Sequence, residues 1–432
     1  MTETWSRSGW IERFRAKGPW VLGFWIVGIA SWLYMAVITD FALLEISVWS
    51  IPFLLLISVV STPWRSVSFS TLWALFMVGL GPIVLLVVLS QGLLALSPAE
   101  VWTRSLFNSL AEAGFETRIT FPSTVIFAPA LEEFFKVVPL LAIIFWGKSR
   151  IRVHSGPIDY AVMAGATGAG FAFGEDLLVY LNQGLHGPTS SFFAFNLGPA
   201  YQSFVGSRPG AFDSDFTNTM SFFFPEMQYI GGVAWIGHGA LALGLGLAIG
   251  LVIWGVRRFH NRWFYLAIPL VYLWVVWEHG MANWYSGAGC AQQDMVPCTI
   301  ADADLRGRLF PFVVLAGWGL AMYVSRRAIR SYRSRDSHLG SNESSVDGYR
   351  STGWRGFVRY ANDWLEVRRW RRRAAYGVEH VESTKKLSQG DLTAMLAARL
   401  RGLEKLETLR GSEPEPLEPD LEQLIAHYTP ID

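Results

Sequence analysis

Three ionisable side chains stand within five positions of an otherwise apolar stretch, "APALEEFFKVVPLL" at residues 128–141: Glu132, Glu133 and Lys136. A charge at bilayer depth costs at least about 2.5–3.5 kcal/mol. Lys136 lies four positions after Glu132 and three after Glu133, so on a helix it shares a face with both. Lys136 can neutralise one carboxylate and leave the other as a base able to activate water.

Three more apolar stretches carry isolated polar groups. Glu175 stands in "GAGFAFGEDLLVY", four positions after Phe171, and His238 stands in "WIGHGALALGLGLAIG". His279 and Asn283 are four positions apart in "VVWEHGMANWYS", so they share a helix face. Because each group is costly to bury alone, we expect all of them to converge around one shared, hydrated cavity.

The composition is that of a membrane protein. Of the 432 residues, 51% are hydrophobic and 16% are charged, and 20 are tryptophan and 29 phenylalanine. A water-soluble fold of this length could not bury so much apolar surface, so the lipid bilayer is the expected solvent. The net charge of +1 gives no indication of nucleic acid, and no nucleic-acid partner is expected.

About eight stretches approach the roughly 20 apolar residues that a spanning helix needs. We therefore predict an all-α fold, a polytopic transmembrane helix bundle with a cytoplasmic C-terminal tail. The third stretch is long enough to tilt or to hold a kink at Pro82. The predicted spans are 19–39, 43–62, 70–97, 122–147, 157–182, 229–255, 263–283 and 309–325.

Basic residues gather in alternate connections, which places both termini in the cytoplasm of a multi-pass protein of the cell membrane. They occur in the first 18 residues, at Arg65, in "GKSRIR", in "RRFHNR" and after the last span. With this orientation Glu132 and His238 lie roughly ten residues into their spans from the outer side, at about 1.5 Å per residue. The polar groups are therefore expected in the outer half of the membrane.

The chain divides into five expected regions by composition. Residues 1–18 form a basic cytoplasmic N-terminus, and 19–325 form the transmembrane domain. Residues 326–353 are a basic linker, 354–410 a cytoplasmic amphipathic helical tail, and 411–432 an acidic end that is expected to be disordered. The tryptophan-rich part of the tail, 354–373, either lies on the anionic inner leaflet or packs on another helix. Cys290 and Cys298 either form a disulfide or are two thiols.

Taken together, these motifs resemble the PrsW family of intramembrane proteases, which is related to the type II CAAX prenyl proteases. The resemblance covers about residues 120–285. It rests on the order and spacing of motifs that are weak alone. They are the Glu132-Glu133-x-x-Lys136 run, the Phe171-x-x-x-Glu175 pair, His238 in a glycine-rich helix, and the His279-x-x-x-Asn283 pair.

The resemblance implies catalytic roles for these residues. Glu132 would be the general base that activates water. Glu133 would be a second acid or a structural partner of the lysine, and Glu175 and His238 would complete a water or metal site. His279 and Asn283 would polarise the scissile carbonyl and hold the developing oxyanion.

The residues leave open whether the site binds a metal. The residues that could hold a divalent ion such as zinc are Glu175, His238 and His279, with one coordination position open. However, the chain contains no H-E-x-x-H run, and a carboxylate with hydrogen-bond donors can work without a metal.

The expected activity is that of an intramembrane endopeptidase acting on membrane protein substrates. By resemblance, the substrate is a single-span protein such as an anti-sigma factor. Two other functions fit the same residues. One is a non-catalytic scaffold or receptor that keeps the polar cluster for assembly, and the other is a proton-coupled transporter that uses the cluster as a relay.

Overall fold

The computed structural model describes residues 42–95, 127–145, 155–186, 223–230, 233–287 and 307–335, with single positions at 105, 220, 369, 372, 373 and 376. The predicted span 19–39, the two cysteines and the acidic end 411–432 lie outside the described residues. The predictions for them remain predictions.

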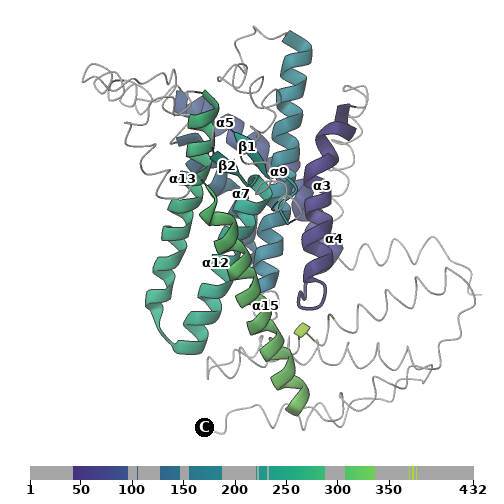
Figure 1. The fold of residues 1–432 in the computed structure, drawn as a ribbon, viewed down its shortest axis with the longest axis vertical. Coiled ribbons are helices and arrows are strands. Elements are labelled where there is room, and N and C mark those ends of the chain that lie inside the picture. The colour runs from purple at the N-terminus through teal and green to yellow at the C-terminus, as the bar shows by residue number, and fades with distance from the viewer. Residues whose placement is uncertain are drawn as a thin grey trace, which may run out of the picture.

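The described part of the chain is mostly helical, as expected (Figure 1). The third predicted span is one helical run in which a π-turn around Pro82 joins two α-helices. In chain order the helices are α3 (Ala42–Ser61), α4 (Phe69–Val78), η1 (Gly79–Ile83), α5 (Val84–Ala95), α7 (Phe127–Phe145), α9 (Pro157–His186), α12 (His238–Phe259), η3 (Arg262–Leu266), α13 (Ala267–Gly287) and α15 (Leu309–Arg335).

Helix α9 runs through the middle of the bundle, between α3 and α4 on one side and α12 on the other (Figure 1). Its residues from Pro157 to Gly174 are all buried. Glycines make this close packing possible: a Cβ on Gly170 would overlap the carbonyl oxygen of Phe76 on α4, and one on Gly246 of α12 would lie 2.6 Å from the carbonyl oxygen of Tyr160. The helix that carries Glu175 is therefore tightly held on two sides.

A short antiparallel hairpin corrects the all-α prediction. Strand β1 (Gln228–Ile230) pairs with β2 (Val233–Trp235), with Ile230 opposite Val233. The expected span 229–255 is therefore wrong at its start, because α12 begins only at His238. His238 lies in the first turn of its helix and not roughly ten residues into it. The hairpin has a signal in the sequence: the dipeptide Gly231-Gly232, which is typical of hairpin turns, stands between two β-prone triplets.

Within the described ranges, four helical runs are both long and apolar enough to cross a membrane: Phe69–Leu93, His238–Phe259, Arg262–Asn283 and Leu309–Arg330. The expected total of eight remains a prediction. The connection between α3 and α4, the connection between α12 and α13, and the end of α15 lie at the same end of the bundle (Figure 1). All three carry arginines, which agrees with the prediction that they share one side of the membrane.

Part of the C-terminal tail packs on this arginine-rich end. Arg372 Nε donates to the carbonyl oxygen of Arg65 at 2.6 Å, and the hydroxyl of Tyr376 donates to that of Trp64 at 2.6 Å. The ring of Tyr376 is buried against Gly156, just before α9. Burial lowers the pKa of the Arg372 guanidinium to about 10. These tail residues therefore contact the protein core.

Candidate active site

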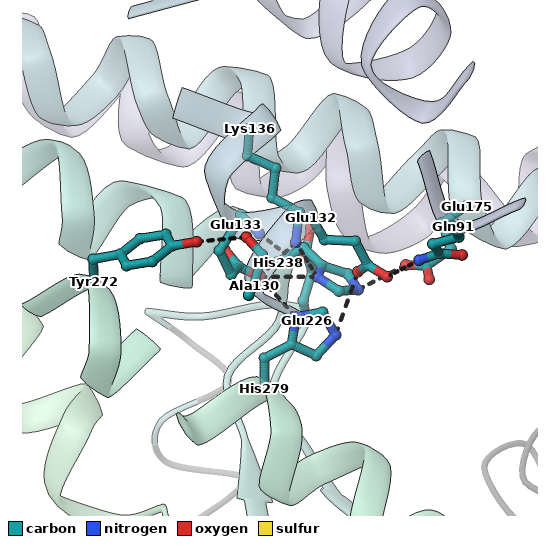
Figure 2. A network of polar contacts seen from close by, with 11 residues as sticks. Gln91, Ala130, Glu132, Glu133, Lys136, Glu175, Glu226, His238, Tyr272 and His279 are labelled. Carbon is teal, nitrogen blue, oxygen red and sulfur yellow. Dashed lines mark hydrogen bonds and ion pairs between the residues drawn. The ribbon is translucent and has the colours of Figure 1, made fainter. Parts of the chain in front are cut away.

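Four helices bring the predicted polar residues together (Figure 2). Helix α7 supplies two glutamates and a lysine, and α9, α12 and α13 supply one residue each. The expected convergence is therefore present in the structure. The residues are Glu132, Glu133, Lys136, Glu175, His238 and His279.

Glu133 is the charged centre of the cluster. Its Oε1 accepts a hydrogen bond from Lys136 Nζ at 2.6 Å and one from His279 Nδ1 at 2.8 Å. Glu133 and Lys136 are both completely buried. Each charge therefore offsets the desolvation of the other, which explains how an apolar helix tolerates them. Because Nδ1 of His279 donates to this carboxylate, its Nε2 carries a lone pair.

His238 joins Lys136 to Glu175. Lys136 Nζ lies 2.6 Å from His238 Nδ1, and an ammonium can only donate. The imidazole therefore accepts at Nδ1, and its Nε2 donates to Glu175 Oε2 at 2.7 Å. Phe171 supports this arrangement from α9: its ring lies 4.4 Å from Lys136 Nζ and 5.3 Å from the His238 ring. The side chain of Glu175 is 28% exposed, so the cluster opens at this point.

Glu132 faces His279 across a gap. Its Oε1 accepts a hydrogen bond from Gln91 Nε2 of α5 at 2.8 Å. Its Oε2 is buried, lies 3.5 Å from His279 Nε2, and has no hydrogen-bond partner among the described residues. Two electron-pair donors thus face each other, which favours a proton, a water molecule or a cation between them.

Two aromatic residues that the sequence did not predict lie against the cluster. Trp235, the last residue of β2, places its ring 5.1 Å from each of the two imidazole rings, His238 and His279. Tyr272 of α13 donates its hydroxyl hydrogen to the carbonyl oxygen of Ala130 at 2.6 Å, which ties α13 to α7. The hairpin was not predicted, so Trp235 could not be placed near a helix start.

Asn283 lies one turn beyond His279 on α13 and is partly exposed. Its predicted oxyanion role remains a prediction. Glu278 is buried and accepts a hydrogen bond from Trp274 Nε1 at 2.9 Å. This contact ties Glu278 to the preceding turn of α13.

One group of described residues could hold a metal ion. Ligand atoms of Glu132, His238 and His279 all lie within 4.8 Å of one another. This set contains Glu132 in place of the predicted Glu175, which instead contacts His238 Nε2. The donor types fit a divalent ion, because two imidazoles and a carboxylate are ligands of catalytic zinc and Glu132 Oε2 is buried without a hydrogen-bond partner in the described part of the chain. His238 would have to exchange its contact with Lys136 or Glu175 for the ion.

The comparisons with known proteins agree with this geometry. Residues 62–206 match the family model described as PrsW family intramembrane metalloprotease. The match includes the motif residues of α7 and α9 and ends before His238 and His279. No curated protein and no solved structure matches the chain. The predicted resemblance is confirmed over residues 62–206, which are similar to the PrsW family of intramembrane metalloproteases. The described residues also include four helical runs that could cross a membrane.

Proposed function

We propose that this protease cleaves peptide bonds with a water molecule that contacts both Glu132 and His279 from beside the pair. The observation that carries the proposal is the gap between Glu132 Oε2 and His279 Nε2, 3.5 Å wide and buried. The two atoms are too close for a water on the line between them, but a water about 2.8 Å from each can give its proton to Glu132. Its oxygen then attacks the scissile carbonyl carbon. When the C–N bond breaks, the proton on Glu132 passes to the leaving amine.

The other cluster members fix this geometry. Glu133 holds the His279 ring so that Nε2 faces the water, and Lys136 balances the charge of Glu133. This bond favours an acceptor or ligand role for His279 Nε2, since it donates to an oxyanion only when the ring is protonated. We propose the Asn283 amide as the oxyanion donor, where one fixed donor contributes about 2.7–4 kcal/mol.

The same pocket would hold a divalent cation through Glu132 and His279 Nε2, and through His238 once its ring gives up its contact with Lys136 or with Glu175. Such an ion would lower the pKa of a bound water and polarise the substrate carbonyl. With Glu132 engaged as a ligand, Glu175 is the nearby carboxylate left to accept the water proton, because it lies at the partly exposed end of the cluster.

We propose single-span membrane proteins, of the anti-sigma-factor type, as the substrates. The helices around the site expose apolar side chains, including Leu270 and Leu273 of α13 at 65% and 62% exposure. Such faces suit lipid. A substrate helix that unwinds beside the bundle would offer its backbone to the partly exposed Glu175 end of the cluster. Both termini are proposed to lie in the cytoplasm.

The test uses the purified protein in liposomes with a single-span substrate carrying a fluorophore and a quencher. Glu132→Gln is expected to lower kcat by at least 10²–10⁴-fold, the usual contribution of a general base. Glu278→Gln is the matched control, because Glu278 and Glu132 are each only 5% exposed, and it should keep its activity. Wild-type cleavage by folded Glu132→Gln would exclude this mechanism.

Metal dependence has its own measurement. Treatment with a chelator should abolish cleavage, and addition of zinc should restore it, if the cation supplies the activated water. Elemental analysis of the purified protein should then find about one equivalent of metal, and less in His279→Ala. Full activity in metal-free protein would instead leave Glu132 as the base.

A further inference from the structure

The first turn of α12 is capped by a residue from outside the helix. The N-cap position is Gly237, which has no side chain to accept a hydrogen bond. Glu226, which lies just before the hairpin, places its Oε2 3.0 Å from the backbone nitrogen of Gly239 and accepts its hydrogen. Helix N-termini leave such N–H groups without partners, and a carboxylate there also interacts favourably with the helix dipole.

The local sequence requires this arrangement. Gly237 has a φ of +87°, a conformation that side chains other than glycine rarely adopt, and a Cβ there would overlap the Cβ of Glu226. A serine or aspartate cap, the usual solution, is therefore excluded at this position. Glu226 takes the place of the missing cap and is itself 94% buried, with 6% exposure.

The capped turn begins with a residue of the proposed active site. His238 is the first residue of α12, and both of its ring nitrogens are engaged, Nδ1 by Lys136 at 2.6 Å and Nε2 by Glu175 at 2.7 Å. A shift of this turn would move the imidazole relative to partners on two other helices. Figure 2 draws Glu226 in the same close-up as His238 and His279.

We propose that Glu226 is a positioning residue of the protease: it holds the start of α12 so that the His238 imidazole stays between Lys136 and Glu175. This inference rests on the proposed function for its effect on catalysis. The capping part concerns the fold alone and can be measured without any substrate.

The first experiment measures hydrogen exchange of the α12 first turn by mass spectrometry. Glu226→Ala should speed exchange of the amides after His238 by about 2- to 30-fold, the range expected for loss of one cap. Glu226→Gln should remain close to wild type, because its amide oxygen can still accept from Gly239. Ser68→Ala is the control, since Ser68 Oγ caps α4 by accepting from Thr71 N at 3.2 Å, and it should leave α12 unchanged.

The second experiment measures cleavage in liposomes. Glu226→Ala should lower kcat by about 10- to 100-fold with little change in KM, as small misplacements of catalytic groups do, and Glu226→Gln should restore most of kcat. Wild-type exchange and kcat in Glu226→Ala would overturn the proposal. So would a Glu226→Gln protein that exchanges slowly but is as inactive as Glu226→Ala, because the charge itself would then be needed. Failure of the proposed function shows separately, as full activity in Glu132→Gln.

Discussion

Replacing Lys136 by methionine tests the charge balance on which the cluster depends. The substitution keeps the length of the side chain and removes the ammonium that lies 2.6 Å from Glu133 Oε1 and 2.6 Å from His238 Nδ1. Glu133 would remain fully buried with His279 as its hydrogen-bond partner from the cluster. The variant should therefore be strongly destabilised.

The expected size follows from the burial of the pair. Both side chains are 0% exposed, and removing one partner of a buried ion pair costs about 3–5 kcal/mol. With an unfolding entropy of about 2.1 cal/mol/K per residue, a chain of 432 residues shifts by about 1 °C per kcal/mol, so the unfolding temperature should fall by about 3–6 °C. Adding Glu133→Gln removes the uncompensated charge, so the double variant should recover most of the stability.

Thermal unfolding of the purified proteins in detergent, followed by tryptophan fluorescence, measures this cycle. Activity should fall in the single variant because His238 Nδ1 loses its donor, and in the double variant also because His279 no longer bonds a carboxylate at position 133. An unfolding temperature of Lys136→Met within 2 °C of wild type would refute the argument. So would a double variant that is less stable than Lys136→Met, since the two losses would then be independent.

Three further outcomes are expected. Gln91→Leu removes the donor to Glu132 Oε1 and should lower kcat about tenfold in the liposome assay at unchanged KM; an unchanged kcat would show that this bond does not orient the carboxylate. Gly170→Ala should reduce the yield of folded protein, because the backbone of α4 occupies the position of the added methyl group. Gly81→Ala should not, because no atom lies within 4 Å of the Cβ that it adds. Tyr376→Ala should lower the unfolding temperature by several degrees through loss of a buried ring, and an unchanged temperature would show that this contact does not stabilise the core.

The sequence was informative about single elements because local patterns determine them. The apolar stretches predicted α3, α12, α13 and α15, and the long stretch around Pro82 became one run with a π-turn. Three- and four-residue spacing predicted that Lys136 would neutralise one of the two glutamates, and its Nζ lies 2.6 Å from Glu133 Oε1. The start of α12 was wrong, because hydropathy does not distinguish three apolar strand residues from the first turn of a helix.

Contacts between different helices and strands could not be predicted from local sequence patterns. Gln91, Glu226 and Trp235 are ordinary residues in their local sequence, and each gains its role only from a partner on another element. The choice of carboxylate for a metal is a similar case. The sequence predicted Glu175 as the carboxylate ligand, whereas the side-chain positions place Glu132 with the two imidazoles in one compact group.

The sequence by itself determined that this chain belongs in a membrane and that costly polar groups on several spans must compensate one another, because the cost of burying a charge is a property of the residue and its solvent. Only the tertiary structure decided how they do so. Glu133 is the charged centre between Lys136 and His279, and Glu132 is left with one oxygen facing the open gap. That division depends on distances of a few ångströms between helices, and no spacing within one helix contains them.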